Sequence, residues 1–118
     1  MPDVLNPVQI EQSIREVSNR IGRGVAVCDE RYRAFLAADR QYDARFAAEY
    51  LAATGPAHEK KYAAELACIA ERAERDTADA AYRYADRQAR ALEAELRAWQ
   101  SVGASVRAMY ATAGRGES

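Results

Sequence analysis

The apolar positions in the first half of the chain recur every three or four residues, the spacing of one face of an α-helix. They are Ile10, Ile14, Val17, Ile21, Val25, Cys28, Tyr32, Phe35, Tyr42, Phe46 and Tyr50. At the start of this run Asn6 can cap a helix, Pro7 suits the first helical position and Gln9 can complete a capping box. The pattern predicts a helix over about residues 7–53.

A second apolar stripe of helical spacing follows the tripeptide Thr54-Gly55-Pro56. Glycine supplies the left-handed conformation that ends a helix, and proline cannot continue one. The second stripe consists of Tyr62, Leu66, Ile69, Ala73, Ala80, Tyr84, Ala91, Leu92, Leu96, Trp99, Val102, Val106 and Tyr110. We therefore predict a turn at 54–57, a second helix over about 58–112 and a frayed tail at 113–118.

The two stripes match when the chain is folded at Pro56, so that residues whose numbers sum to about 112 face each other. The expected pairs include Tyr50 with Tyr62, Phe46 with Leu66, Tyr42 with Ile69 or Ala70, Tyr32 with Ala80 or Ala81, and Ile14 with Trp99. The predicted fold is all-α: one domain, residues 1–118, forming a long, coiled-coil-like antiparallel two-helix hairpin. Because such a hairpin buries only one face of each helix, we expect it to associate into a helical bundle.

Gly22 and Gly24 lie within the first predicted helix. Each weakens a helix by about 1 kcal/mol relative to alanine. The apolar stripe continues through both glycines, so we expect a bend or soft point there and not a break.

Composition supports long helices over a compact globular core. The chain has 27 alanines, and Ala, Glu, Lys, Leu and Arg together make up just over half of it. The net charge of −1 argues against a basic nucleic-acid-binding protein of the usual kind. The sequence has no run of 18 apolar residues and no signal-like start, so we expect a cytoplasmic protein without a membrane span.

Arginines form a row along the second predicted helix, close to Tyr82, Tyr84 and Trp99. Basic rows with aromatic neighbours can follow a nucleic-acid backbone and stack on its bases. The candidate nucleic-acid-binding residues are Arg83, Arg87, Arg90, Arg97, Arg107 and Arg115.

The same arginines have a simpler interpretation, because acidic residues often precede them by four positions, the helix-stabilising order. These pairs are Glu71–Arg75, Asp79–Arg83, Asp86–Arg90 and Glu93–Arg97, and in the first helix Glu11–Arg15, Glu16–Arg20 and Asp29–Arg33. The alternative to a nucleic-acid surface is a solvent-exposed helix face on which these arginines form ion pairs with acidic residues of the same helix.

Residue types that carry chemistry are sparse. The hairpin register separates Cys28 from Cys68, so both are interpreted as small apolar residues and not as a disulfide. His58 is the only histidine, which makes a metal site improbable. No nucleotide-binding or catalytic motif is present, and a two-helix hairpin lacks a concave site. We expect no enzymatic activity, no cofactor and no small-molecule substrate.

The segment around Trp99 is poor in charge and rich in small residues. It forms either the core at the open end of the hairpin or a docking patch for a partner or a second copy. The candidate interface residues are Ile10, Ile14, Leu96, Trp99, Val102, Val106, Met109 and Tyr110.

Two segments carry a resemblance to a known group of proteins. They are residues 55–62, Gly-Pro-Ala-His-Glu-Lys-Lys-Tyr, and residues 96–106, Leu-Arg-Ala-Trp-Gln-Ser-Val-Gly-Ala-Ser-Val. Their pairing resembles small helical-hairpin proteins encoded by tailed phages, and the layout is similar to phage recombination mediators of the UvsY type. The resemblance implies an oligomeric accessory protein in the host cytoplasm that binds single-stranded DNA and a recombinase in DNA recombination or replication.

Two other functions are compatible with the same residues. One is an adaptor or inhibitor that binds only protein, and the other is a component of virion assembly. All three are non-enzymatic, and nothing in the sequence separates them.

Overall fold

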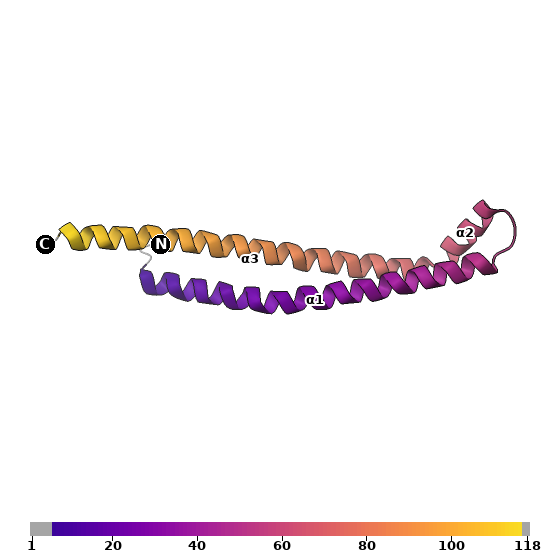
Figure 1. Cartoon of the computed structure of the whole chain (residues 1–118), viewed down its shortest axis with the longest axis horizontal. Helices are drawn as coiled ribbons and strands as arrows, with labels where there is room; N and C mark the ends of the chain where they lie inside the picture. The colour runs from indigo at the N-terminus through magenta and orange to yellow at the C-terminus, as the bar shows by residue number, and fades with distance from the viewer. Residues whose placement is uncertain (1–5, 117–118) are drawn as a thin grey trace. The chain divides into compact units, whose positions relative to one another are not determined.

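The computed structural model describes residues 6–116, and these residues contain no strand. The helices are α1 (Pro7–Ala52), α2 (Ala57–Ala67) and α3 (Ile69–Gly116) (Figure 1). The all-α class is confirmed, but the structure has three helices where the sequence predicted two. Helix α3 also continues to Gly116, through most of the segment predicted to fray.

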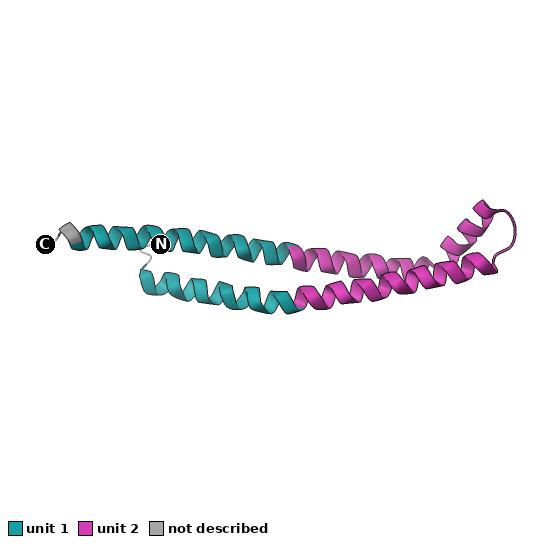
Figure 2. Cartoon of the chain, viewed as in Figure 1, with its two compact units in different colours: residues 1–26, 87–118 teal, residues 27–86 magenta. Residues whose placement is uncertain are grey.

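The chain divides into two compact units, and α1 and α3 each contribute to both of them (Figure 2). Unit 1 is formed by residues 1–26 and 87–118, and unit 2 by residues 27–86.

Helix α1 begins with the predicted capping box. The Gln9 backbone N–H donates to the Asn6 side-chain oxygen at 2.9 Å, and the Asn6 N–H donates to the Gln9 side-chain oxygen at 3.3 Å. These reciprocal bonds satisfy donors that the first helical turn leaves free. The helix is continuous through Gly22 and Gly24.

Gly55 has a backbone φ of +103°, a conformation that residues with a Cβ rarely adopt. Helix α1 ends three residues before Gly55, and α2 begins two residues after it. The Pro56 carbonyl accepts hydrogen bonds from the N–H groups of Glu59 and Lys60, at 3.0 and 3.1 Å, and so opens α2.

Replacing Gly55 by alanine should lower the free energy of unfolding by about 1–2 kcal/mol, because an L-residue is strained at this φ. Gly22→Ala is the matched control, for which the free energy of unfolding should change in the opposite direction. A Cβ at Gly22 meets nothing within 4 Å, so alanine there should stabilise the helix by about 1 kcal/mol. Urea unfolding followed by circular dichroism measures both changes. Equal effects of the two substitutions would contradict this account of the turn.

A single residue, Cys68, separates α2 from α3 and so corrects the predicted continuous helix over 58–112. Its φ of −106° and ψ of 18° are not helical, and its N–H is shared between the carbonyls of Ala64 and Glu65, at 3.1 and 3.3 Å. The Arg72 N–H donates to the Cys68 carbonyl at 2.9 Å, so Cys68 ends α2 and its carbonyl accepts the first hydrogen bond of α3. No glycine or proline marks this position. Ala64 and Cys68 are both fully buried, and we attribute the break to this packing.

In unit 1, α1 packs antiparallel against α3. Ile10 and Val17 are buried, at 2% and 3% exposure. A Cβ on the buried Gly103 would lie 3.3 Å from Ile10 Cγ2, so the absence of a side chain at Gly103 allows the close approach. Arg20 also contacts Glu95 of α3, at 3.9 Å.

In unit 2, aromatic rings of α1 contact charged and aromatic side chains of α2 and α3. The Tyr32 and Tyr82 ring centroids are 5.0 Å apart. The Arg75 guanidinium lies over the Tyr42 ring at 4.3 Å. Tyr42 thus contacts Arg75 where Ile69 or Ala70 was expected, whereas Tyr32 contacts Tyr82, the residue next to the expected Ala81.

The face of α2 and the first part of α3 that packs against α1 is therefore not the predicted one. Ala64, Cys68 and Ala85 are buried, whereas the predicted core residues Tyr62, Leu66, Ile69 and Tyr84 are exposed. The physical reason lies in α1, whose contact face already carries large rings. The residues of α2 and α3 on the packed face are mostly small, and those that are large lie against rings of α1: Arg75 over Tyr42, and Tyr82 tilted against Tyr32.

Candidate functional site

An apolar stripe lies on the solvent side of α2 and α3 in unit 2. Its large members are Tyr62, Leu66, Ile69 and Tyr84, which are 61%, 71%, 60% and 59% exposed. Ala73 and Ala80 lie between them and are also exposed. Tyr62 and Leu66 lie one turn apart on α2, and steps of four and seven residues place Ile69, Ala73, Ala80 and Tyr84 on one face of α3. We call the six residues Tyr62, Leu66, Ile69, Ala73, Ala80 and Tyr84 the outer stripe.

The outer stripe is opposite the face that packs against α1. Ala64, Cys68, Ala78 and Ala85 are buried or half-buried on that packed face. At about 100° per residue, the packed face lies roughly half a turn round the helix from the outer stripe. The same segment thus has two apolar faces, and α1 covers only one of them.

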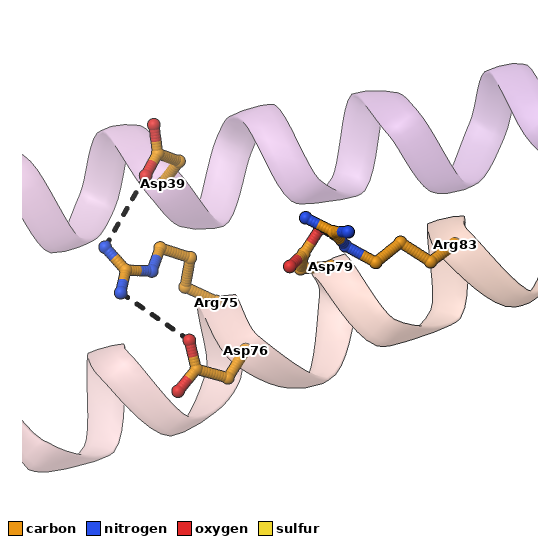
Figure 3. A network of polar contacts seen from close by, with 5 residues as sticks. All are labelled: Asp39, Arg75, Asp76, Asp79 and Arg83. Carbon is orange, nitrogen blue, oxygen red and sulfur yellow. Dashed lines mark hydrogen bonds and ion pairs between the residues drawn. The ribbon is translucent and has the colours of Figure 1, made fainter.

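Charged residues border one side of the outer stripe. We call Glu65, Arg72, Asp76 and Arg83 the charged flank, and they lie roughly 50–100° round the helix from the stripe, all on the same side. The Arg83 Nε donates to the Asp79 carboxylate at 3.0 Å, and Arg75 lies 3.5 Å from Asp76 and 3.8 Å from Asp39 of α1 (Figure 3). Every member of these ion pairs stays in contact with solvent, from 26% exposure at Arg75 to 69% at Arg83, so each pair adds about 1 kcal/mol or less to stability.

The fully buried Cys68 thiol lies close to a charged group at the packed face. Burial raises the pKa of the Cys68 thiol, and the nearby Glu71 carboxylate adds to that rise. Arg45 donates to Glu49 at 2.9 Å and lies 3.8 Å from Glu71, and the hydrogen bond to Glu49 raises the pKa of Arg45. The thiol is therefore held neutral, consistent with the small apolar role expected for it. Cys28 and Cys68 are both free.

The predicted self-pairing of charges is found in part. Asp79–Arg83 and Asp29–Arg33 form at 3.0 and 2.9 Å, in the expected order. Glu71 and Arg75, which were expected to pair with each other, reach across to α1. Contacts between helices depend on the register, which local spacing does not reveal.

The candidate nucleic-acid-binding arginines fall in different parts of the structure. Arg83 belongs to unit 2, and Arg87, Arg90, Arg97 and Arg107 belong to unit 1. All five are exposed, and the side chain of Arg115 lies outside the described residues.

The candidate interface at the Trp99 end lies in unit 1, and most of it faces α1. Ile10 is buried, and Ile14, Leu96, Trp99, Val102 and Val106 are half-buried. Met109 and Tyr110 are 68% and 55% exposed. Only these last two present most of their surface to a partner.

Among residues 6–116, no group of three or more histidine, cysteine or acidic side chains is arranged to hold a metal ion. His58 is exposed in the first turn of α2. Within the same residues, none of the helices combines the length and apolar character needed to span a bilayer.

The sequence predicts that the large residues of the outer stripe pack against α1, and this prediction is wrong because they are exposed. A second small-residue pattern at Ala64, Cys68, Ala78 and Ala85 was the signal that could have identified the packed face. Comparisons with known protein families, with curated proteins and with solved structures found no match to this chain.

Proposed function

We propose that this protein is a non-enzymatic accessory protein that binds another protein chain through the outer stripe. The observation that carries the proposal is the exposure of Tyr62 and Leu66 on α2 and of Ile69 at the start of α3. Single exposed apolar residues are ordinary, but a row of large ones marks an interaction surface. The stripe also resembles the apolar face by which amphipathic helices bind partners.

The energetics favour a partner over a solvated face. Fully burying a leucine, isoleucine or aromatic side chain contributes about 1.5–3 kcal/mol. Four large side chains of the outer stripe remain mostly in water. Covering them would contribute several kcal/mol, enough to offset part of the entropy lost on association.

A pair of substitutions within the outer stripe tests this function. In cells of the source organism, chemical crosslinking of the tagged chain followed by quantitative mass spectrometry should identify specific partners. Leu66→Glu with Ile69→Glu should reduce their recovery at least tenfold, because charges would be forced into an apolar contact. Val25→Glu is the matched control, since Val25 is 65% exposed on α1. Equal recovery of the same proteins with the wild-type chain, the Leu66→Glu, Ile69→Glu chain and the Val25→Glu chain would refute the proposal.

Binding of single-stranded DNA is a second candidate, and with a recombinase as the protein partner it forms the recombination function implied by the resemblance. Arg97 and Arg107 favour it, because both are exposed on α3 in unit 1, the part of the helix that also carries Trp99. Fluorescence anisotropy with a labelled oligo-dT should show binding that weakens with salt and falls when both arginines are replaced by alanine. No anisotropy change at low salt would exclude this candidate.

A further inference from the structure

We propose that α2 opens from α1 as a separate unit while α1 and α3 stay packed, and that this opening divides the outer stripe. The proposal deepens the function proposed above and rests on it, because it concerns the regulation of the same surface. Three features of unit 2 support it: the small apolar area that holds α2, the non-helical residues at its two ends, and the stronger anchoring of α3.

Little apolar surface holds α2 against α1. Of the 11 residues of α2 only Ala64 is buried, and alanine brings a single methyl group to the contact. The two largest apolar side chains of α2, Tyr62 and Leu66, are 61% and 71% exposed. The Lys60 ammonium lies 5.7 Å from the centroid of the Tyr50 ring, near the limit for a cation–π contact. Docking of α2 is therefore weak.

Cys68 forms a hinge between α2 and α3. Its N–H donates to the carbonyls of Ala64 and Glu65 in α2, and its own carbonyl accepts from Arg72 of α3. Rotation about φ and ψ of Cys68 leaves these hydrogen bonds in place, because each of them joins atoms on one side of the rotation. The two angles are −106° and 18°, and α2 does not continue the line of α3 (Figure 1).

The chain before α2 is not helical either. Gly55 has a φ of +103°, and Pro56 is extended, with φ −65° and ψ 160°, and gives α2 no side-chain cap. A helix of 11 residues is shorter than the roughly 12–15 residues below which isolated helices are marginal in water. Once α2 leaves α1 it therefore loses its backbone hydrogen bonds, which makes the opening measurable by hydrogen exchange.

Helix α3 is anchored to α1 directly after the hinge. Glu71 lies 3.8 Å from Arg45, and Arg75 lies 3.8 Å from Asp39. The Arg75 guanidinium also covers the Tyr42 ring at 4.3 Å. These contacts hold the first two turns of α3 to α1, so the opening stops at the hinge.

The same hinge divides the outer stripe. Tyr62 and Leu66 lie on α2, whereas Ile69 and the later members lie on α3. While α2 is docked through the buried Ala64, the two groups keep a fixed arrangement, and this arrangement is lost when α2 opens. A partner that contacts both groups binds the docked form more tightly. By thermodynamic linkage, docking of α2 strengthens partner binding and partner binding favours docking.

Hydrogen exchange of the whole chain in increasing urea tests the opening. After correction for intrinsic rates, the amides of residues 61–67 should exchange at least about tenfold faster than those of residues 75–85. The rates of residues 61–67 should stay nearly constant up to about 1 M urea, because the opening exposes little surface. Equal rates and equal urea dependence in the two segments would overturn the separate opening of α2.

Ala63→Gly changes the opening through helix propensity alone, since Ala63 is exposed. It should speed exchange of residues 61–67 about fivefold and leave residues 75–85 unchanged. Equal acceleration of both segments would show that α2 and α3 open together, against the proposal.

Ala64→Asp tests the link between docking and the outer stripe. Ala64 is buried on the packed face, so its side chain does not meet a partner on the stripe. Recovery of crosslinked partners should nevertheless fall at least about threefold, because Tyr62 and Leu66 leave the stripe with α2. Ala47→Asp is the matched control, since Ala47 is exposed on α1, and it should leave recovery unchanged.

The two proposals fail in different ways. Recovery that the Leu66→Glu, Ile69→Glu chain does not reduce overturns the proposed function, and hydrogen exchange of the wild-type chain still decides whether α2 opens. Recovery that Ala64→Asp does not reduce, although its residues 61–67 exchange fast, overturns the regulation and leaves the proposed function in place.

Discussion

Replacing Ile10 by alanine is expected to lower the free energy of unfolding by about 2–5 kcal/mol. Ile10 is 2% exposed and lies against Gly103 of α3 in unit 1. The neighbouring glycine has no side chain that could move into the space. The lost methyl groups would therefore leave a cavity, whose cost adds to the lost burial.

Urea unfolding followed by circular dichroism measures the effect of Ile10→Ala. Val8→Ala is the matched control, because Val8 lies on the same helix and is 63% exposed, so its truncation should change stability by less than about 0.5 kcal/mol. Hydrogen exchange should show lost protection at the start of α1 and in the part of α3 around Gly103. Equal destabilisation by the two substitutions would contradict the packing of Ile10.

Ala64→Asp is expected to destabilise the contact between α2 and α1 by more than about 3 kcal/mol. Ala64 is fully buried on the packed face, and a carboxylate there would lose its hydration. Because α2 has only 11 residues, it should separate from α1 locally before the rest of unit 2 unfolds. Hydrogen exchange of residues 57–67 should therefore become fast.

Ala63→Asp is the control for Ala64→Asp, because Ala63 is the adjacent residue and is exposed. Both changes have the same cost in helix propensity, so their difference isolates burial. The effect of Ala64→Asp should also shrink in acid, where the introduced carboxyl group is neutral. If Ala63→Asp speeds exchange as much as Ala64→Asp does, the packed face has been assigned wrongly.

The two apolar faces of α2 and α3 explain why the sequence predicts these helices but not the face that packs against α1. Tyr62, Leu66, Ile69 and Tyr84 have a clear helical spacing and are large, so the sequence predicts that they form the core. Ala64, Cys68 and Ala85 have the same spacing, but small residues carry a weak signal. The choice between the faces depends on the rings that α1 presents, such as Tyr42 beneath Arg75. No pattern within one helix contains that information.

In unit 1 the packed face predicted from the apolar periodicity agrees with the structure. Leu92, Leu96, Trp99, Val102 and Val106 were predicted to lie in the seam, and all are half-buried. Here α3 has only one strongly apolar face, so the periodicity alone identified it. The candidate interface drawn from these residues is largely the packing between α1 and α3, apart from Met109 and Tyr110.

Local chemistry accounts for the features that were readable along the chain. The capping box of Asn6 and Gln9, the left-handed glycine at the turn and the helical spacing all act over a few residues, so sequence neighbours suffice to specify them. The break at Cys68, the ion pairs between helices and the exposure of the outer stripe arise only when α1 meets α2 and α3. Which of the two apolar faces packs against α1 depends on the side-chain volume that α1 places opposite it. That volume is set only when the chain is folded.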